Sequence, residues 1–194
     1  MIKINCDQEL IKYRDIIKDR IDVCFPIDYL KQGKVYGLYN FQGEILGGFS
    51  IISQGPFRVL NSIPNFKHLE IDPKLKYTAE ITGLWLKSSE DAKCASLKFW
   101  IYFIIKMLTT RKKYFVYAYS SKKSNLRKLY AKANPIQLFE GETLLQPGMK
   151  ETECESVELI IKKKLLIQIF CHVRFFIKRA ILGRKFKNSQ RNVA

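Results

Sequence analysis

AEITGLWLK (79–87) and YFVYAYSS (114–121) have the apolar, β-branched and aromatic composition of buried strands. SSEDAKCAS (88–96) opens a helix predicted over 91–110, and NLRKLYAKAN (125–134) belongs to a second helix predicted over 124–133. Strand and helix therefore alternate within one short part of the chain. This order predicts a domain of the α/β or α+β class.

Further elements are predicted on both sides of this segment. Apolar residues recur at helical spacing over 8–21, after a short first strand. KVYGLYNF (34–41) and EILGGFSIIS (44–53) predict two strands that Gln42-Gly43 joins as an antiparallel hairpin. Three prolines in 56–76 predict a long ordered loop. The other strands are expected at 77–87, 114–121, 136–144 and 154–161.

Composition favours one globular domain and an acidic partner. The chain has 194 residues, of which 47% are hydrophobic and 13% aromatic, so it can form a full core. Its net charge of +16 would attract nucleic acid, an anionic membrane, a CoA phosphate or an acyl carrier protein. The five cysteines are scattered without a CxxC pair, which favours the reducing cytoplasm and predicts no metal site.

The C-terminal tail, 161–194, differs in composition from residues 1–160, which we expect to form the globular domain. It holds ten Lys or Arg residues and no acid around an apolar centre, LLIQIFCHVRFFIKRAIL. Its longest uncharged run, Leu165–Val173, is nine residues long, well below the roughly 20 that span a bilayer. The tail is therefore predicted to be a basic amphipathic helix that lies on an anionic membrane or docks a carrier protein. Alternatively, its apolar side chains simply pack on the domain.

The order of elements resembles the GCN5-related N-acyltransferase (GNAT) superfamily. That resemblance implies a mixed, mostly antiparallel sheet flanked by helices, and an enzyme that transfers an acyl group from acyl-CoA or acyl carrier protein to an amine. The acid-Ile-Thr segment at 80–82 is also similar to the Glu-Ile-Ser stretch of acyl-homoserine-lactone synthases and, more loosely, to long-chain N-acyl amino acid synthases. Both groups take acyl chains from carrier proteins, although Gly83 stands where those synthases favour arginine.

Two residues are candidates for catalysis. Glu80 lies in an apolar run, where burial would raise its pKa toward the range of a general base. Tyr130 lies five residues after Asn125, as in the GNAT pattern, in which a tyrosine protonates the departing thiolate. Asn134 and Pro135 replace the glycine and aromatic residue of that pattern, and asparagine suits a left-handed helix end. The structural alternatives are a salt-bridged strand acid and a tyrosine that packs its helix on the sheet.

The resemblance also implies residues that hold the acyl donor. Gly83 would mark a bulge that opens the strand, and the backbone of the next residues would pair with pantetheine: Leu84, Trp85 and Leu86. The phosphate loop of the superfamily would correspond to 88–96, where small or basic residues are expected to approach phosphate: Ala92, Lys93, Cys94, Ala95 and Ser96. Ser88 or Ser89 could cap the following helix, and Asn125 would bond pantetheine or cap its own helix. Glu90 and Asp91 oppose a diphosphate, which favours a carrier-protein phosphopantetheine.

Two functions remain open from the sequence. The first is a cytoplasmic N-acyltransferase, peripheral at the inner face of the membrane, that moves a medium or long acyl chain to a small amine, an amino acid, or a Lys or ornithine side chain of a peptide. The second is a non-catalytic GNAT-like domain that binds anionic membrane through its tail. Nucleic acid is disfavoured because the basic residues of the tail stand among Phe, Ile and Leu.

Overall fold

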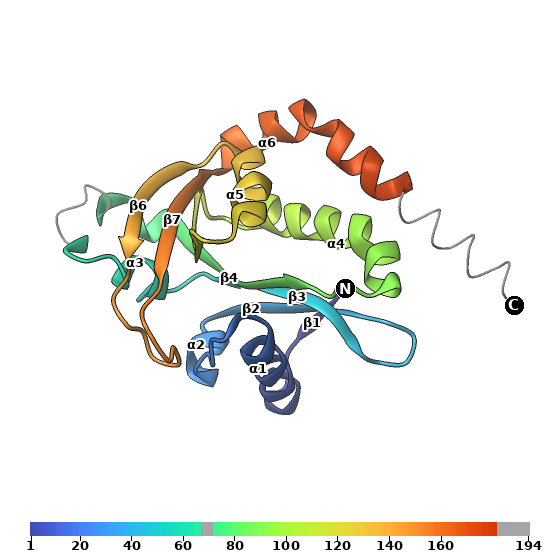
Figure 1. Ribbon diagram of the computed structural model, residues 1–194, viewed down its shortest axis with the longest axis horizontal. Helices are drawn as coiled ribbons and strands as arrows, with labels where there is room; N and C mark the ends of the chain where they lie inside the picture. The colour runs from blue at the N-terminus through green and yellow to red at the C-terminus, as the bar shows by residue number, and fades with distance from the viewer. Residues whose placement is uncertain (67–71, 182–194) are drawn as a thin grey trace, which may run out of the picture.

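A seven-stranded sheet forms the centre of the computed structural model, which describes residues 1–66 and 72–181 (Figure 1). The order across the sheet is β1-β2-β3-β4-β5-β7-β6, and of the described pairs only β4 and β5 run parallel. The mixed, mostly antiparallel sheet predicted from the sequence is therefore confirmed. The strands are β1 (Ile2–Ile4), β2 (Gly33–Tyr39), β3 (Ile45–Ile52), β4 (Thr78–Leu86), β5 (Tyr114–Ser120), β6 (Ile136–Glu142) and β7 (Cys154–Ile161).

Helices cover both faces of the sheet (Figure 1). One face carries α1 (Asp7–Ile21) and α2 (Ile27–Lys31), and the other carries α4 (Glu90–Thr109), α5 (Ser124–Tyr130) and α6 (Lys162–Cys171). Residues 173–181 form a further helical stretch after a turn at His172. The shorter helices are α3 (Arg58–Asn61), η2 (Asp72–Tyr77) and η3 (Ala131–Ala133).

The predicted loop at 56–76 is wrong in part, because its described residues include α3 and most of η2. Helix α2 was not predicted either. Helices of four to six residues make only one or two turns, so they leave no apolar periodicity to detect. These short helices matter because two of them face the candidate site.

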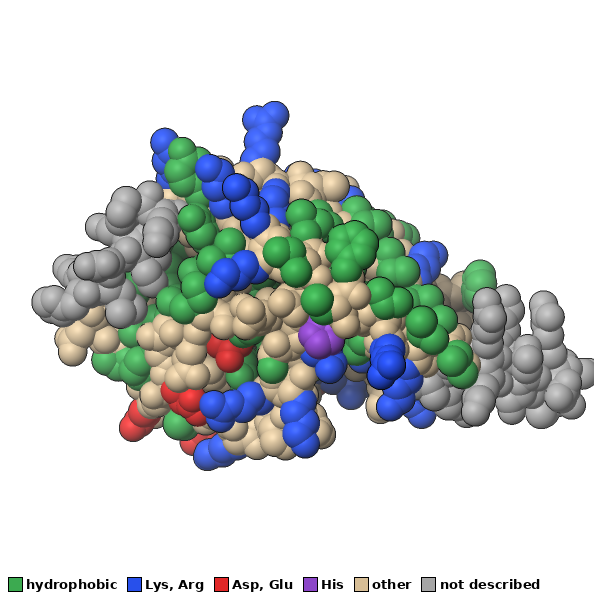
Figure 2. Space-filling view, turned by 90° about the horizontal axis from the view of Figure 1, so that it is seen from above, with side chains coloured by type: hydrophobic (Ala, Val, Ile, Leu, Met, Phe, Trp, Pro, Cys, Tyr) green, Lys and Arg blue, Asp and Glu red, His purple; other side chains and the backbone are tan. Residues whose placement is uncertain are grey.

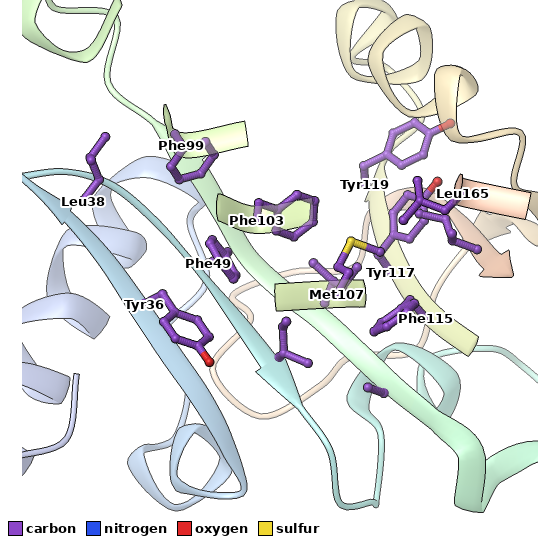
Figure 3. Close-up of a cluster of buried hydrophobic side chains, with 14 of the residues drawn as sticks. Tyr36, Leu38, Phe49, Phe99, Phe103, Met107, Phe115, Tyr117, Tyr119 and Leu165 are labelled. Carbon is purple, nitrogen blue, oxygen red and sulfur yellow. The ribbon is translucent and has the colours of Figure 1, made fainter. Parts of the chain in front are cut away.

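The larger hydrophobic cluster lies between the sheet and α4. Phe49 of β3 meets Phe99 and Phe103 of α4 edge to face, with ring centroids 6.0 and 4.9 Å apart (Figure 3). On the outer side of α4, the ring of Trp100 packs edge to face against that of Phe175, with the ring centroids 5.9 Å apart. The sheet and the C-terminal helices thus cover α4 from two sides, while Ile101 and Ile105 of this helix stay exposed.

A second cluster fills the opposite face of the sheet, beneath α1 and α2. Tyr13 and Ile17 of α1 and Leu30 of α2 are almost fully buried there. The Tyr13 hydroxyl donates a hydrogen bond to the Gly83 carbonyl at 3.1 Å, so α1 is fixed directly to the middle of β4. This contact anchors the strand where its backbone is least regular.

The parallel pair of β4 and β5 is short. Only Thr78, Ala79 and Glu80 pair with β5, and the two strands diverge beyond Glu80. On its other edge, β4 pairs with β3 through a bulge, because Ser50 lies opposite Thr82 whereas Gly48 lies opposite Trp85. Gly83 lies within this bulge at φ +61, which confirms the bulge expected there.

Gly83→Ala is expected to destabilise the protein more than Gly43→Ala. Both glycines have positive φ, where a side chain costs about 1–2 kcal/mol. A Cβ at Gly83 would lie 2.9 Å from Ile17 Cδ1, whereas nothing lies within 4 Å of a Cβ at Gly43. Denaturant unfolding of the two variants measures the difference, and equal losses in the free energy of unfolding would contradict the tight packing of α1 on the bulge.

Candidate active site

A cavity of about 260 Å³ opens where β4 and β5 diverge. Its walls include residues 81–84 of β4 and 117–120 of β5. Phe25 lines it from the α1 and α2 face of the sheet, and Phe103 lines it from the α4 face. The cavity therefore passes through the sheet at the split, so that two molecules approaching from opposite faces could meet inside it.

Glu80 lies at the point where the split begins. It is the last residue of the parallel pair, and its side chain is 1% exposed. One carboxylate oxygen accepts a hydrogen bond from the Tyr29 hydroxyl, and the other accepts from the Val59 backbone N–H at 3.2 Å. Burial raises the pKa of Glu80 to about 7, although these hydrogen bonds and Arg58 favour the charged form. Near neutral pH, Glu80 can therefore both take up and release a proton.

Arg58 lines the cavity beside Glu80. Its guanidinium carbon lies 4.9 Å from the Phe25 ring centroid and 5.3 Å from that of Tyr29. Nε and Nη1 are buried and have no hydrogen-bond partner among the described residues. Burial lowers the pKa of Arg58, while Tyr29, Glu80 and Glu155 oppose that shift. The site thus contains a desolvated cation with unused donors.

Tyr130 reaches the same cavity from the end of α5. The centroid of its ring lies 4.7 Å from that of Tyr117 and 5.1 Å from that of Tyr119, both on β5. Tyr130 is half-buried and lines the cavity. The buried Glu158 carboxylate on β7 accepts hydrogen bonds from the hydroxyls of Tyr117 and Tyr119. Burial, followed by the charge of Glu158, raises the pKa of Tyr130, so its phenol stays protonated and can donate a hydrogen bond.

Four of the candidate residues meet at this cavity: Glu80, Gly83, Leu84 and Tyr130. Trp85 is buried instead in the cluster under α1 and α2, and Leu86 packs at the margin of the α4 cluster. Asn125 is exposed near the start of α5, and the left-handed end expected at Asn134 is present at φ 48. None of Trp85, Leu86 and Asn125 is among the residues that line the cavity.

The candidate phosphate-loop residues lie in the first turns of α4, outside the cavity lining. The Ser89 side chain caps the helix by accepting from the Ala92 N–H at 3.4 Å. Ala92 is fully buried, Lys93 is exposed, and Cys94 and Ala95 are half-buried. The remaining candidate, Ser96, is buried and accepts a hydrogen bond from the Arg179 guanidinium. Residues 173–181 thus place the Arg179 guanidinium near the start of α4, where the sequence has two acids, Glu90 and Asp91.

Three residues of the site were not predicted from the sequence: Tyr29, Arg58 and Glu158. In GPFRVL, Arg58 stands between apolar neighbours, a pattern that indicates a buried charge as it does for Glu80. Arg58 was missed because it lies in the segment predicted to be a loop. Glu158 similarly interrupts the apolar strand SVELII. Tyr29 gives no comparable signal, because a tyrosine in a short helix looks like an ordinary core residue.

The described residues contain neither a His, Cys, Asp or Glu cluster suited to a metal ion nor a helix long and apolar enough to cross a membrane. The segment 56–76 also contains His68, whose imidazole could transfer a proton, but this residue lies outside those that the structure describes.

Several solved structures resemble this protein over most of the length of both chains. FeeM, an N-acyl amino acid synthase from uncultured soil microbes, matches with a TM-score of 0.59 and 16% identity, over 86% of this chain and 96% of that one. The fold is that of the GNAT superfamily. A mutant form of SpeG, a spermidine/spermine N-acetyltransferase from Vibrio cholerae, matches with a TM-score of 0.55 and 9% identity, over 86% of this chain and 96% of that one.

A third GNAT-fold match is an N-acetyltransferase from Staphylococcus aureus Mu50, with a TM-score of 0.52 and 13% identity over 83% of this chain and 98% of that one. No family model and no curated protein sequence matches the chain. At these identities the likeness establishes the GNAT fold, whereas the chemistry has to be argued from the residues of this site.

We expect Glu80 to make stability depend on pH. Its pKa is about 7 in the folded protein against 4.5 for an ordinary glutamate, so the folded state binds more protons between these values. The free energy of unfolding should therefore fall as pH rises from about 4.5 to 7, by roughly 3 kcal/mol for the 2.5-unit difference. Denaturant unfolding across this range should show the fall in wild type and a smaller fall in Glu80→Gln. Identical slopes would mean that Glu80 is already charged at pH 5.

Proposed function

We propose that the protein is an N-acyltransferase whose general base is Glu80 and whose general acid is Tyr130. The observation that carries this proposal is a buried carboxylate, with a pKa of about 7, at the point where β4 and β5 separate into a cavity through the sheet. Tyr130 lines the same cavity with a protonated phenol. Acyl transfer from a thioester to an amine needs a base for the ammonium and a donor for the thiolate, and both are present.

The reaction follows from this arrangement. Glu80 removes a proton from the ammonium of the acceptor, and the free amine attacks the thioester carbonyl carbon. The tetrahedral oxyanion would be stabilised by backbone N–H groups near Gly83 and Leu84, where β4 no longer pairs with β5. The C–N bond forms first, and the tetrahedral intermediate then collapses as its C–S bond breaks and Tyr130 gives its proton to the departing thiolate. The attacking nitrogen still carries one proton more than the amide product, and it gives that proton to the Tyr130 phenolate. Glu80 ends the cycle protonated, and loss of its proton to solvent restores the enzyme.

The donor is a pantetheine thioester with a medium or long acyl chain, carried by CoA or by acyl carrier protein. On the α4 face of the sheet, the cavity is lined by apolar side chains from α4 and the C-terminal helices, including Trp100, Phe103, Ile169, Phe175 and Phe176. An acetyl group would leave these walls uncovered. The acids at the start of α4 favour a donor with one phosphodiester, and the charge of +16 favours an acidic carrier protein.

Glu80→Gln and Tyr130→Phe should lower kcat by about 10² to 10⁴-fold, the usual contribution of a general acid or base. The assay is intact-mass analysis after incubation with acyl-CoAs and acyl carrier proteins of graded chain length and a pool of amines. Wild-type activity should rise as pH passes through about 7, because Glu80 acts in its charged form. Glu9→Gln and Tyr77→Phe, both exposed and outside the cavity, serve as matched controls.

Absence of turnover with every donor would overturn the enzymatic proposal. In that case, the non-catalytic alternative, a GNAT-fold domain that binds membrane through its tail, would remain. The second alternative outcome is turnover unaffected by Glu80→Gln, which would assign the role of base to another group.

We further propose that the C-terminal helices dock on an anionic membrane. Hydrophobic side chains at helical spacing remain exposed along them, and Figure 2 shows such side chains gathered on this face together with Lys and Arg. The residues are Leu166, Phe170, Val173, Ile177 and Ile181, and Phe170 is 77% exposed. Residues 161–181 contain six Lys or Arg and no acid. A surface that is both apolar and cationic complements an anionic lipid bilayer.

Phe170→Ser and Ile177→Ser should each weaken binding to phosphatidylserine-containing vesicles by about tenfold or more, because each removes an apolar side chain from the interface. Vesicle co-sedimentation measures the affinity, and added salt should weaken it further. Phe41→Ser is the matched control, since Phe41 is fully exposed in the hairpin between β2 and β3. Equal losses from Phe41→Ser, or stronger sedimentation with oligonucleotide than with vesicles, would contradict membrane docking.

A further inference from the structure

We infer that Arg58 binds the carboxylate of the acceptor, and that the acceptor is therefore an α-amino acid. This inference rests on the proposed acyltransferase function and adds the substrate class to it. Its basis is the Arg58 guanidinium, which lines the cavity beside Glu80 and has two buried nitrogens without a hydrogen-bond partner in residues 1–66 and 72–181.

Arg58 has hydrogen-bond donors for which the described residues offer no acceptor. Buried polar groups in proteins nearly always have hydrogen-bond partners, so two buried guanidinium nitrogens without one require an explanation. Within the described part of the chain, Arg58 forms no ion pair and packs instead against the rings of Phe25 and Tyr29. A planar guanidinium held in place by aromatic rings is preorganised to bind a carboxylate through two parallel hydrogen bonds.

Arg58 and Glu80 contact the same side chain, that of Tyr29. The Tyr29 hydroxyl donates to Glu80, while the Arg58 guanidinium carbon lies 5.3 Å from the Tyr29 ring centroid. The two charged groups are also close enough for each to shift the pKa of the other. An amino group and a carboxylate joined by a single carbon fit such a pair, with the ammonium at Glu80 and the carboxylate at Arg58. A diamine or polyamine would place no anion near Arg58.

Acids other than Glu80 also line the cavity, namely Asp22, Glu151, Glu153 and Glu155. Glu155 lines it, accepts a hydrogen bond from the Thr143 hydroxyl at 2.9 Å, and contributes to the charge around Arg58. Lys150 also lines it but is paired with Asp22 at 2.7 Å. The acids therefore attract the ammonium of the acceptor, and Arg58 offers donors to its carboxylate. This division of charge matches a zwitterion better than a simple amine.

Arg58 could instead serve only as a counter-ion that adjusts the proton affinity of Glu80. The two roles differ in what a substitution changes. A counter-ion affects every acceptor alike through the base, whereas a carboxylate receptor affects only acceptors that carry a carboxylate. The experiment therefore varies the protein and the acceptor together.

The experiment compares acceptors in matched triplets with the best acyl donor: an amino acid, its primary amide, and the amine that lacks the carboxylate. Wild-type kcat/KM should favour the acid by about 100-fold or more, since a site built for a polar group strongly rejects analogues without it. Arg58→Gln should abolish this preference by lowering kcat/KM for the acid far more than for the amide and the amine, mainly through KM. Arg58→Lys should keep part of it, and Arg20→Gln, at an exposed arginine outside the cavity lining, should keep all of it.

Equal wild-type rates for all three members of each triplet would overturn the inference and leave the acyltransferase proposal intact. A uniform loss in Arg58→Gln with a displaced pH-rate profile would also overturn it, by assigning Arg58 the counter-ion role. Absence of turnover with any amine would instead overturn the proposed function. The wild-type comparison remains decisive even where an Arg58 variant fails to fold, which thermal unfolding would reveal.

Discussion

Three residue pairs hold β4 against β5, and the position where this pairing ends determines the rest of the site. Antiparallel pairs continue along both outer parts of the sheet, so the divergence is confined to one seam. A continuous sheet would satisfy these backbone groups internally and would leave no passage between its faces. The bulge at Gly83 and the hydrogen bond from Tyr13 keep β4 away from β5 beyond Glu80. The cavity, Glu80 and Tyr130 all lie along the resulting gap.

The seam also creates two distinct electrostatic environments. Beneath the sheet, Glu80 is surrounded by Tyr29, Val59 and Arg58, which contribute donors and a positive charge. Above it, Tyr130 lies among two tyrosines that share the Glu158 carboxylate. A carboxylate that can lose its proton near pH 7 and a phenol that keeps its proton are therefore held on opposite sides of one cavity.

Local patterns in the sequence were sufficient to predict much of this arrangement. The apolar run around Glu80 predicted burial, the glycine at 83 predicted a bulge, and Asn134 predicted a left-handed helix end; all three are present. Strand periodicity could not tell which residues would face the cavity. Trp85 therefore lies under α1, and the partners of Glu80 come from helices too short to leave a pattern. Contacts between distant short segments depend on tertiary packing, which local periodicity does not encode.

The C-terminal helices present apolar side chains in two directions. Phe175 and Phe176 form part of the cavity wall, whereas Phe170 and Ile177 face outward. Under the membrane docking proposed above, a movement of these helices at their outer face would also change the cavity wall. A lipid surface that draws these helices away from α4 would enlarge the cavity at the expense of the Trp100 and Ser96 contacts. If the lipid surface weakens binding of an acyl chain in this way, an acyl chain that holds the helices against α4 must weaken the attachment to lipid by the same factor.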